Sequence, residues 1–77
     1  MANLRTIRRQ QLLSQRDLAR KSGVTASTIY LIENDRTMPR LSVMRRLCEA
    51  LNVSPTDVDE FAQALDAAEK ADAIGTR

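Results

Sequence analysis

LSQRDLARKSGVTASTIYLIE, residues 13–33, contains two helix starts separated by a very short turn. Ser14 precedes Asp17 by three residues, which is the spacing of a capping box at a helix N-terminus. Gly23 can take the left-handed conformation that ends a helix. Thr25 can cap a second helix that begins directly afterwards. Two capped helices this close together must cross steeply, so we expect the second one to protrude from its partner.

The second helix of this stretch has two different faces. At 100° per residue, Ile29 and Ile32 fall on the side that faces the core, and Glu33 points toward the flank of that side. The opposite face is small and polar at its N-terminal end and consists of Ala26, Ser27, Tyr30, Leu31 and Asn34. A protruding helix with such a face is narrow enough to enter a DNA major groove, which is the arrangement of a helix-turn-helix.

Helical periodicity continues on both sides of the motif. A first helix is expected over about residues 3–12, with Leu4 and Ile7 facing inward. A fourth helix follows Pro39, and its apolar positions are Leu41, Met44, Leu47, Cys48 and Leu51. A fifth helix is expected to open at Ser54-Pro55-Thr56-Asp57. Its apolar stripe consists of Val58, Phe61, Ala62 and Leu65.

The predicted fold class is therefore all-α, with five short helices and a helix-turn-helix formed by the second and third. Seventy-seven residues make one domain, near the lower size limit for a single apolar core. We place that domain at residues 1–68. Residues 69–77 are expected to form the C-terminal end of the fifth helix and a tail.

Composition excludes several classes of protein. The chain contains no histidine and one cysteine, so metal sites built on these ligands are excluded, and we expect neither metal nor cofactor. Cys48 is interpreted as a small core residue. The longest apolar run, residues 29–32, is far too short to span a membrane. With no apolar signal region near Met1, the protein is expected to be cytoplasmic.

Charge is distributed unevenly along the chain. Residues 1–46 carry ten basic and three acidic residues, a balance of +7, whereas residues 47–77 have a balance of −5. A basic front half suits a polyanion such as DNA, and an acidic back half would face away from it. A solvated surface with uneven ends fits the same pattern, so charge alone leaves both interpretations open.

In combination, these motifs resemble the lambda-repressor-like helix-turn-helix family, which includes phage Cro and repressor domains and the xenobiotic-response-element regulators. The resemblance covers roughly residues 4–61 and rests on Leu13-Ser14-Gln15, Leu18-Ala19, Gly23-Val24-Thr25, Ile29, Ile32-Glu33-Asn34, Pro39, and Leu47 through Leu51-Asn52-Val53. It implies a sequence-specific transcriptional regulator, a repressor, that reads double-stranded DNA with its third helix. It also implies a homodimer on a two-fold operator, associated with the nucleoid.

The resemblance also implies site residues. Contacts to bases or the groove would come from Ala26, Ser27, Thr28, Tyr30 and Leu31. Contacts to phosphate would come from Gln15, Asn34, Arg36 and Arg40. Tyr30 can equally lie flat over the protein surface, and Leu31 is either a contact to a thymine methyl or a surface leucine. Four arginines are expected to be solvated and to act only through the electrostatic field of the protein: Arg8, Arg9, Arg45 and Arg46.

Three positions depart from the family's pattern. Leu12 stands where a glycine usually ends the first helix, and Asp35 replaces the usual glycine after Asn34. Asp35 also places an acid near the expected phosphate. Ala26 stands where relatives often carry glutamine, which removes one amide that could read a base.

Two other functions were compared with DNA binding. An enzyme is disfavoured, because the chain has no histidine and the acids of its back half are scattered around one exposed helix. A protein-interaction module is the stronger alternative, with the acidic fifth helix binding a basic partner. For the dimer contact, we expect an outward strip of small residues on that helix, Ala64, Ala67, Ala71 and Ile74.

Overall fold

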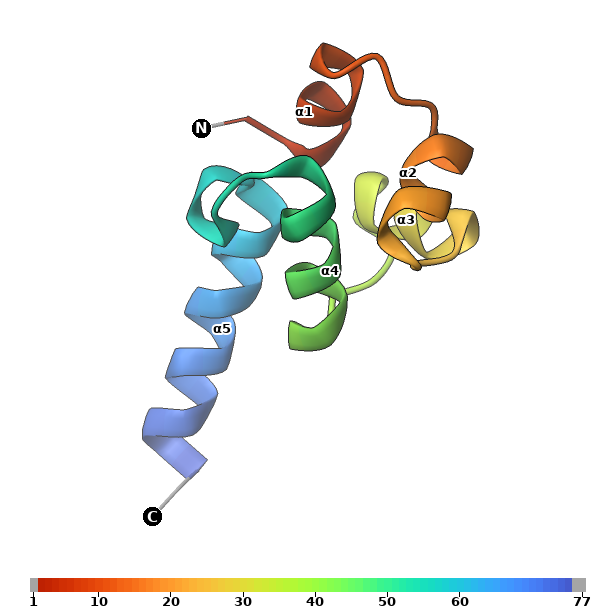
Figure 1. Cartoon of the computed structure of the whole chain (residues 1–77). Coiled ribbons are helices and arrows are strands. Elements are labelled where there is room, and N and C mark those ends of the chain that lie inside the picture. The colour runs from red at the N-terminus through yellow and green to blue at the C-terminus, as the bar shows by residue number, and fades with distance from the viewer. Residues whose placement is uncertain (1, 76–77) are drawn as a thin grey trace.

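The computed structural model describes the backbone of residues 2–75 and the side chains of residues 2–67. Its elements are α1 (Leu4–Gln10), α2 (Gln15–Ser22), α3 (Ala26–Glu33), α4 (Leu41–Leu51), a 3-10 turn η1 (Pro55–Asp57) and α5 (Asp59–Gly75). Within the described range, the only extended pairing is an isolated parallel bridge between Ala2 and Val58. The all-α class with five helices is therefore confirmed (Figure 1).

The helices of the central motif begin and end at the expected capping residues. The Ser14 hydroxyl accepts a hydrogen bond from the Asp17 amide at 3.0 Å, and the Asp17 carboxylate accepts one from the Ser14 amide at 3.0 Å. Gly23 ends α2 in the left-handed conformation, at φ 79°. The Thr25 hydroxyl then accepts a hydrogen bond from the Thr28 amide at 3.2 Å. Only residues 23–25 separate α2 from α3, so the connection is as short as the sequence predicts.

All five helices contribute to one apolar core. Its largest fully buried side chains are Leu4, Leu18, Ile29, Ile32, Leu47, Leu51, Val58 and Phe61. Cys48 belongs to this core, and burial, together with the charge of Asp57, raises the pKa of its thiol above the ordinary value. A buried thiol with a raised pKa is a poor nucleophile. Cys48 is thus a core residue, as its position between two leucines predicts.

The predicted start of the fifth helix is wrong. Residues 55–57 form a separate 3-10 turn, and Val58 has an extended backbone at φ −110° and ψ 119°. The Asp59 amide donates to the Ala2 carbonyl at 2.9 Å, and the Ala2 amide donates to the Asp57 carbonyl at 3.4 Å. Because these groups bond to the N-terminal segment, they cannot continue a helical turn, and α5 begins at Asp59.

Two side chains face the opposite way from their predicted direction. Leu41, expected in the core, lies in the first turn of α4 and is 62% exposed, while Pro39 just before it is buried. Ala64, expected on an outer strip of α5, is buried. Ala64 and Leu65 follow Phe61 by three and four residues, so both lie on the same face of α5 as the buried Phe61. Ala67 is exposed, whereas the side chains of Ala71 and Ile74 lie outside the described residues.

Two residues adopt the left-handed conformation at the positions where the family usually has glycine. Leu12 has φ 59° and its side chain is 91% exposed, and Asp35 has φ 54°. The connection after α1 therefore keeps the backbone path that a glycine would take. A side chain with a Cβ is strained in this conformation.

Replacing Leu12 by glycine should stabilise the protein by about 1 kcal/mol, because it relieves the left-handed strain at a small entropic cost in the unfolded chain. Urea denaturation measures this as a higher midpoint with an unchanged slope. Leu12→Ala is the matched control, because it removes the exposed side chain but keeps the Cβ. If Leu12→Ala stabilised the protein as much as Leu12→Gly, backbone strain would not be the cause.

Candidate nucleic-acid interface

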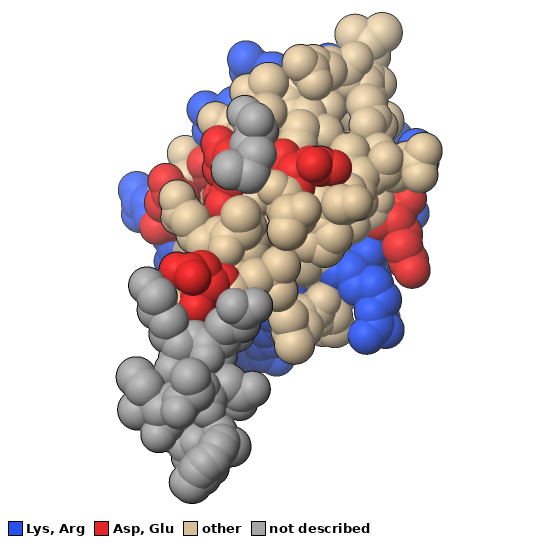
Figure 2. Space-filling model, turned by 90° about the vertical axis from the view of Figure 1, so that its left-hand side faces the viewer, with Lys and Arg blue, Asp and Glu red and all other residues tan. Residues whose placement is uncertain are grey.

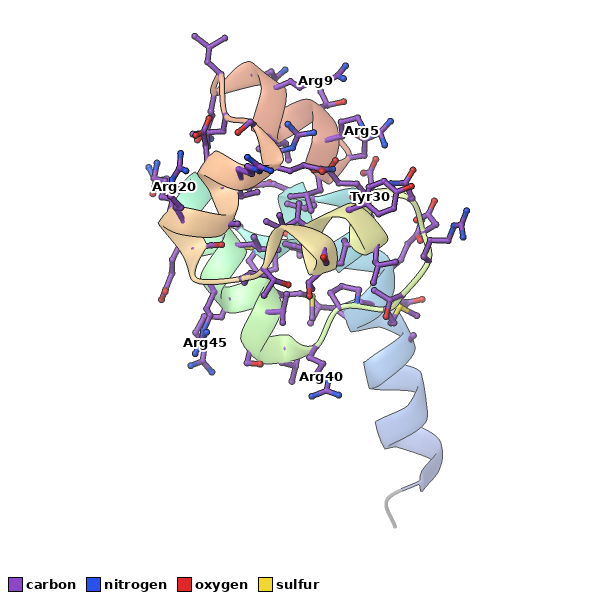
Figure 3. The ribbon with its side chains drawn as sticks, turned by 90° about the vertical axis from the view of Figure 1, so that its right-hand side faces the viewer. Arg5, Arg9, Arg20, Tyr30, Arg40 and Arg45 are labelled. Carbon is purple, nitrogen blue, oxygen red and sulfur yellow. The ribbon has the colours of Figure 1, made fainter. Side chains whose placement is uncertain are left out.

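The outer face of α3 remains accessible after the protein folds. Its inner residues Ile29 and Ile32 are buried, whereas Tyr30 is 50% exposed and Leu31 is 40% exposed. Ser27 is exposed near the N-terminus of the helix, where the side chains are small. In Figure 3, α3 lies at the front of the molecule and the Tyr30 side chain projects beside it.

The structure brings most of the predicted contact residues together. A concavity of about 430 Å³ is lined by Gln15, Ala26, Ser27, Tyr30 and Leu31, so the start of α2 adjoins the outer face of α3. A second hollow, of about 300 Å³, has Thr28, Leu31 and Arg40 in its lining. Asn34 is half-buried at the end of α3, and Arg36 is exposed just beyond it. Together, these residues form a continuous surface that follows α3 from one end to the other.

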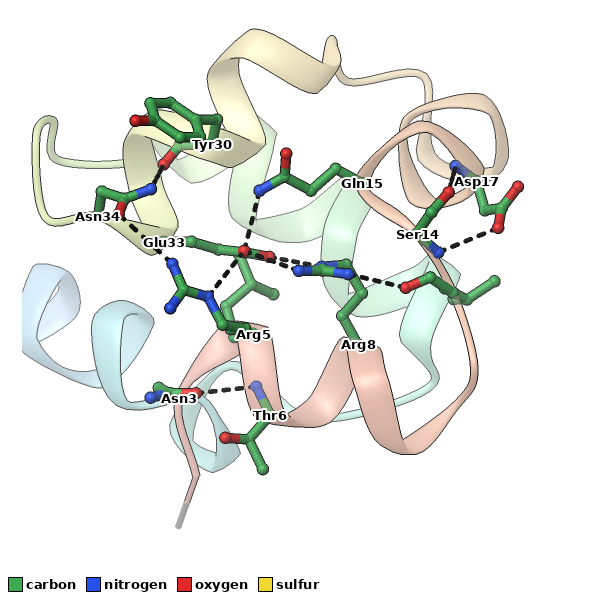
Figure 4. Close-up of polar contacts among 12 residues, drawn as sticks. Asn3, Arg5, Thr6, Arg8, Ser14, Gln15, Asp17, Tyr30, Glu33 and Asn34 are labelled. Carbon is green, nitrogen blue, oxygen red and sulfur yellow. Dashed lines mark hydrogen bonds and ion pairs between the residues drawn. The ribbon is translucent and has the colours of Figure 1, made fainter.

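A buried ion pair lies beneath this surface. Arg8 Nε is 2.7 Å from Glu33 Oε2, and Arg8 Nη2 donates to Glu33 Oε1 at 3.0 Å. The Glu33 side chain is fully buried, and that of Arg8 is 8% exposed. Arg8 Nη1 also donates to the Leu13 carbonyl at 2.8 Å, which fixes the connection between α1 and α2 (Figure 4). The expectation that Arg8 is solvated is therefore wrong.

Hydrogen bonds within the protein orient two of the residues that were predicted to contact phosphate. Gln15 Nε2 donates to Glu33 Oε1 at 3.1 Å. Because a carboxylate accepts hydrogen bonds and does not donate them, this contact determines which end of the Gln15 amide faces Glu33. Asn34 is oriented at the other end of the network, where its Nδ2 donates to the Tyr30 carbonyl at 2.8 Å. Both amides are thus held by the protein at the edge of the outer face (Figure 4).

Neither the burial of Arg8 nor the network around Glu33 was predicted from the sequence. A signal was nevertheless present, because an acid on the core-side flank of a helix needs a cationic partner when it is buried. Arg8 directly follows Ile7 and lies one turn after Leu4, so it falls beside the inward stripe of α1. What the sequence lacks is the distance between α1 and α3, which depends on the packing of the whole core.

The environment of Glu33 shifts its pKa. Burial alone would raise it, but hydrogen bonds from Arg8 and Gln15, and the positive charge of Arg8, lower the pKa overall below its ordinary value of 4.5. The carboxylate is therefore ionised at neutral pH. No buried side-chain nitrogen or oxygen among the described residues lacks a hydrogen-bond partner.

Charge separates the two faces of the molecule. On the side that carries α5, acidic side chains lie in the middle of the face and at both edges, whereas basic ones lie only toward its edges (Figure 2). On the side that carries α3, basic residues surround the helix, and those marked in Figure 3 are Arg5, Arg9, Arg20, Arg40 and Arg45. A basic rim around a protruding helix is the electrostatic footprint of a surface for a polyanion.

The remaining surface features lie elsewhere. A cavity of about 710 Å³ is lined by α4, the chain that follows it and Leu65, and it includes none of the predicted contact residues. Among the described residues, no group of three or more acidic or cysteine side chains could hold a metal ion. No helix in the described range is long and apolar enough to cross a membrane.

Comparison with known proteins agrees with this geometry. A helix-turn-helix family model matches residues 4–58, most of the chain, so the protein belongs to this family and its lambda-repressor-like fold is confirmed. The HTH-type transcriptional regulators PuuR of Escherichia coli (strain K12) and Shigella flexneri are each 43% identical to it over 51 residues. The match covers 66% of this chain but only 28% of the relatives. No solved structure gave a significant match.

Replacing Glu33 by glutamine should destabilise the fold by about 3–5 kcal/mol, because it leaves the buried Arg8 charge without its counter-ion. Since folding lowers the pKa of Glu33, its contribution is present above pH 4.5 and is lost as the pH falls through the lowered pKa. As the pH falls from 7 to 3, Glu33→Gln should therefore lose less stability than the wild type. Urea denaturation between pH 3 and pH 7 measures both effects.

Two further variants keep this test informative. Asp17→Asn removes an exposed carboxylate whose pKa is also lowered, mainly by its hydrogen bonds with Ser14, so it should leave the Glu33 part of the acid dependence in place. The double variant Arg8→Met with Glu33→Leu leaves no unpaired buried charge, so it should lose less stability than Glu33→Gln alone. An acid dependence in Glu33→Gln equal to that of the wild type would contradict this account.

Proposed function

We propose that the protein is a sequence-specific regulator of transcription that binds double-stranded DNA with α3 in the major groove. The observation that carries the proposal is the outer face of α3. This face is accessible, its side chains near the N-terminus of the helix are small, and arginines surround it. Membership of the helix-turn-helix family supports it, as does the similarity to two HTH-type transcriptional regulators. Repression by occupying an operator requires only a DNA-binding domain of this kind.

Residues of the interface divide into two groups by their chemistry. Base or groove contacts are assigned to Ala26, Ser27, Thr28, Tyr30 and Leu31, which lie along α3. Phosphate contacts are assigned to Gln15, Asn34, Arg36 and Arg40, which lie at the ends of the helices around it. This division matters because phosphate contacts position a protein on the duplex, whereas contacts to base edges select the sequence.

Selection from a pool of random duplexes tests the function and the division together. The wild type should yield one consensus sequence, and its affinity should fall as salt rises. Ser27→Ala and Tyr30→Phe should lose about 1–3 kcal/mol at particular base pairs, because each removes a hydroxyl that can reach a base edge. Gln15→Ala should weaken binding to all sequences alike and leave the consensus unchanged.

Each group of variants serves as the control for the other. Equal losses on the selected duplex and on random DNA for Ser27→Ala and Tyr30→Phe would make both hydroxyls backbone contacts. A changed consensus for Gln15→Ala would remove that side chain from its assigned role. If no duplex bound with salt-dependent affinity, the acidic side of the molecule would become the better candidate surface, for a basic protein partner.

We further propose that the protein binds a two-fold operator as a homodimer. One domain of this size reads only a few base pairs, and two recognition helices must lie about 34 Å apart to read successive turns of one groove. The end of α5 extends beyond the other helices (Figure 1), and the exposed Ala67 lies on this part of the helix. The dimer contact is therefore assigned to the C-terminal part of α5.

A chain that ends after Leu65 should keep its fold, because the core residues Phe61, Ala64 and Leu65 remain. It should lose the dimer contact, and so bind an operator half-site and the full site with similar, weak affinity. Circular dichroism, sedimentation and binding to both duplexes measure these properties. If the intact protein sedimented as a monomer, even on the two-fold operator, the dimer would be excluded.

A further inference from the structure

Arg5 lies beside the C-terminal end of α3, although it belongs to the first turn of α1. Its Nε is 3.5 Å from Glu33 Oε1, and its Nη2 donates to Asn34 Oδ1 at 3.4 Å. The side chain remains 43% exposed. Arg5 and Tyr30 are close to each other on the face that carries α3 (Figure 3), and Arg5 points toward Glu33 in the close-up (Figure 4). No role was predicted for Arg5 from the sequence.

The positive charge of Arg5 is not needed to balance Glu33. Arg8 already neutralises that carboxylate through two contacts, of 2.7 and 3.0 Å. Glu33 Oε1 accepts hydrogen bonds from Arg8 and from Gln15, the latter at 3.1 Å, whereas Arg5 forms only an ion pair with it at 3.5 Å. Two arginines against one glutamate leave a surplus of one positive charge, and the exposed, loosely bound Arg5 carries it.

Arg5 lies where its surplus positive charge can bind an anion. Asn34 holds the guanidinium from one side, and Glu33 holds it from the other. Gln15 is bound to the same oxygen of Glu33. An arginine guanidinium has five N–H donors, so the two contacts made here leave others available to a phosphate oxygen.

We propose that Arg5 binds a phosphate of the DNA backbone, and that Glu33 and Asn34 position its guanidinium for this contact. The inference rests on the proposed function, since it assumes that α3 faces the duplex. It extends the interface from the helix-turn-helix onto α1. The same buried carboxylate then serves both the fold, through Arg8, and the DNA surface, through Arg5 and Gln15.

The dependence of affinity on salt tests this contact, because each neutralised phosphate adds about 0.9 to the slope of log affinity against log salt. Arg5→Gln should lower the slope by about 0.9 on the selected duplex and leave the consensus unchanged. Arg5→Lys should keep the slope, since it keeps the charge. Arg45→Gln is the matched control: it removes one charge at the opposite edge of the face in Figure 3 and should change the slope much less.

Each result decides for or against the inference, provided that thermal unfolding shows every variant folded. An unchanged slope in Arg5→Gln would overturn the inference. The proposed function would still stand, because it depends only on binding of the duplex by the wild type. An equal fall in Arg45→Gln would overturn it by making the effect one of net charge. An equal fall in Arg5→Lys would assign Arg5 a structural role. If the wild type bound no duplex, the proposed function and this contact would fail together.

Discussion

The buried ion pair between Arg8 and Glu33 is the interaction on which the rest of the structure depends. Removing these two charges from water costs several kcal/mol each, so the pair persists only because its geometry is bidentate and its other atoms are hydrogen-bonded. It joins α1 to the end of α3, and the bond from Arg8 to the Leu13 carbonyl fixes the chain that leads into α2. One carboxylate therefore sets the relative positions of three helices.

This constraint explains how a small core can present a helix to a large ligand. The inner face of α3 is held by apolar contacts through Ile29 and Ile32, and its C-terminal end is held by Glu33. Its outer face lies outside the core and is accessible to a ligand. The surrounding arginines supply attraction for phosphate, whereas the small side chains near the N-terminus of α3 allow close approach to base edges. Stability and recognition thus use opposite sides of the same eight-residue helix.

Sequence reasoning succeeded where the determinant is local. The capping box at Ser14 and the left-handed Gly23 are properties of a few adjacent residues, and both have the predicted geometry. It failed where partners are distant in sequence. The bridge between Ala2 and Val58 delays the start of α5. The buried charge of Arg8 is paired with Glu33, which lies 25 positions away. The outer face of the candidate site was predictable from helical periodicity, but the network that orients it was not, because its distances are set by core packing.

The central claim is that DNA meets the side of the molecule formed by α3 and the start of α2. Titrating the isotopically labelled protein with its selected duplex and following backbone amide shifts by NMR tests this most directly. The account predicts that the largest shifts occur from Gln15 to Arg40 and at the start of α1, and that α4 beyond its first turns and α5 up to Leu65 change little. Shifts concentrated on the acidic side, around Asp57 and Asp66, with none along α3, would contradict it.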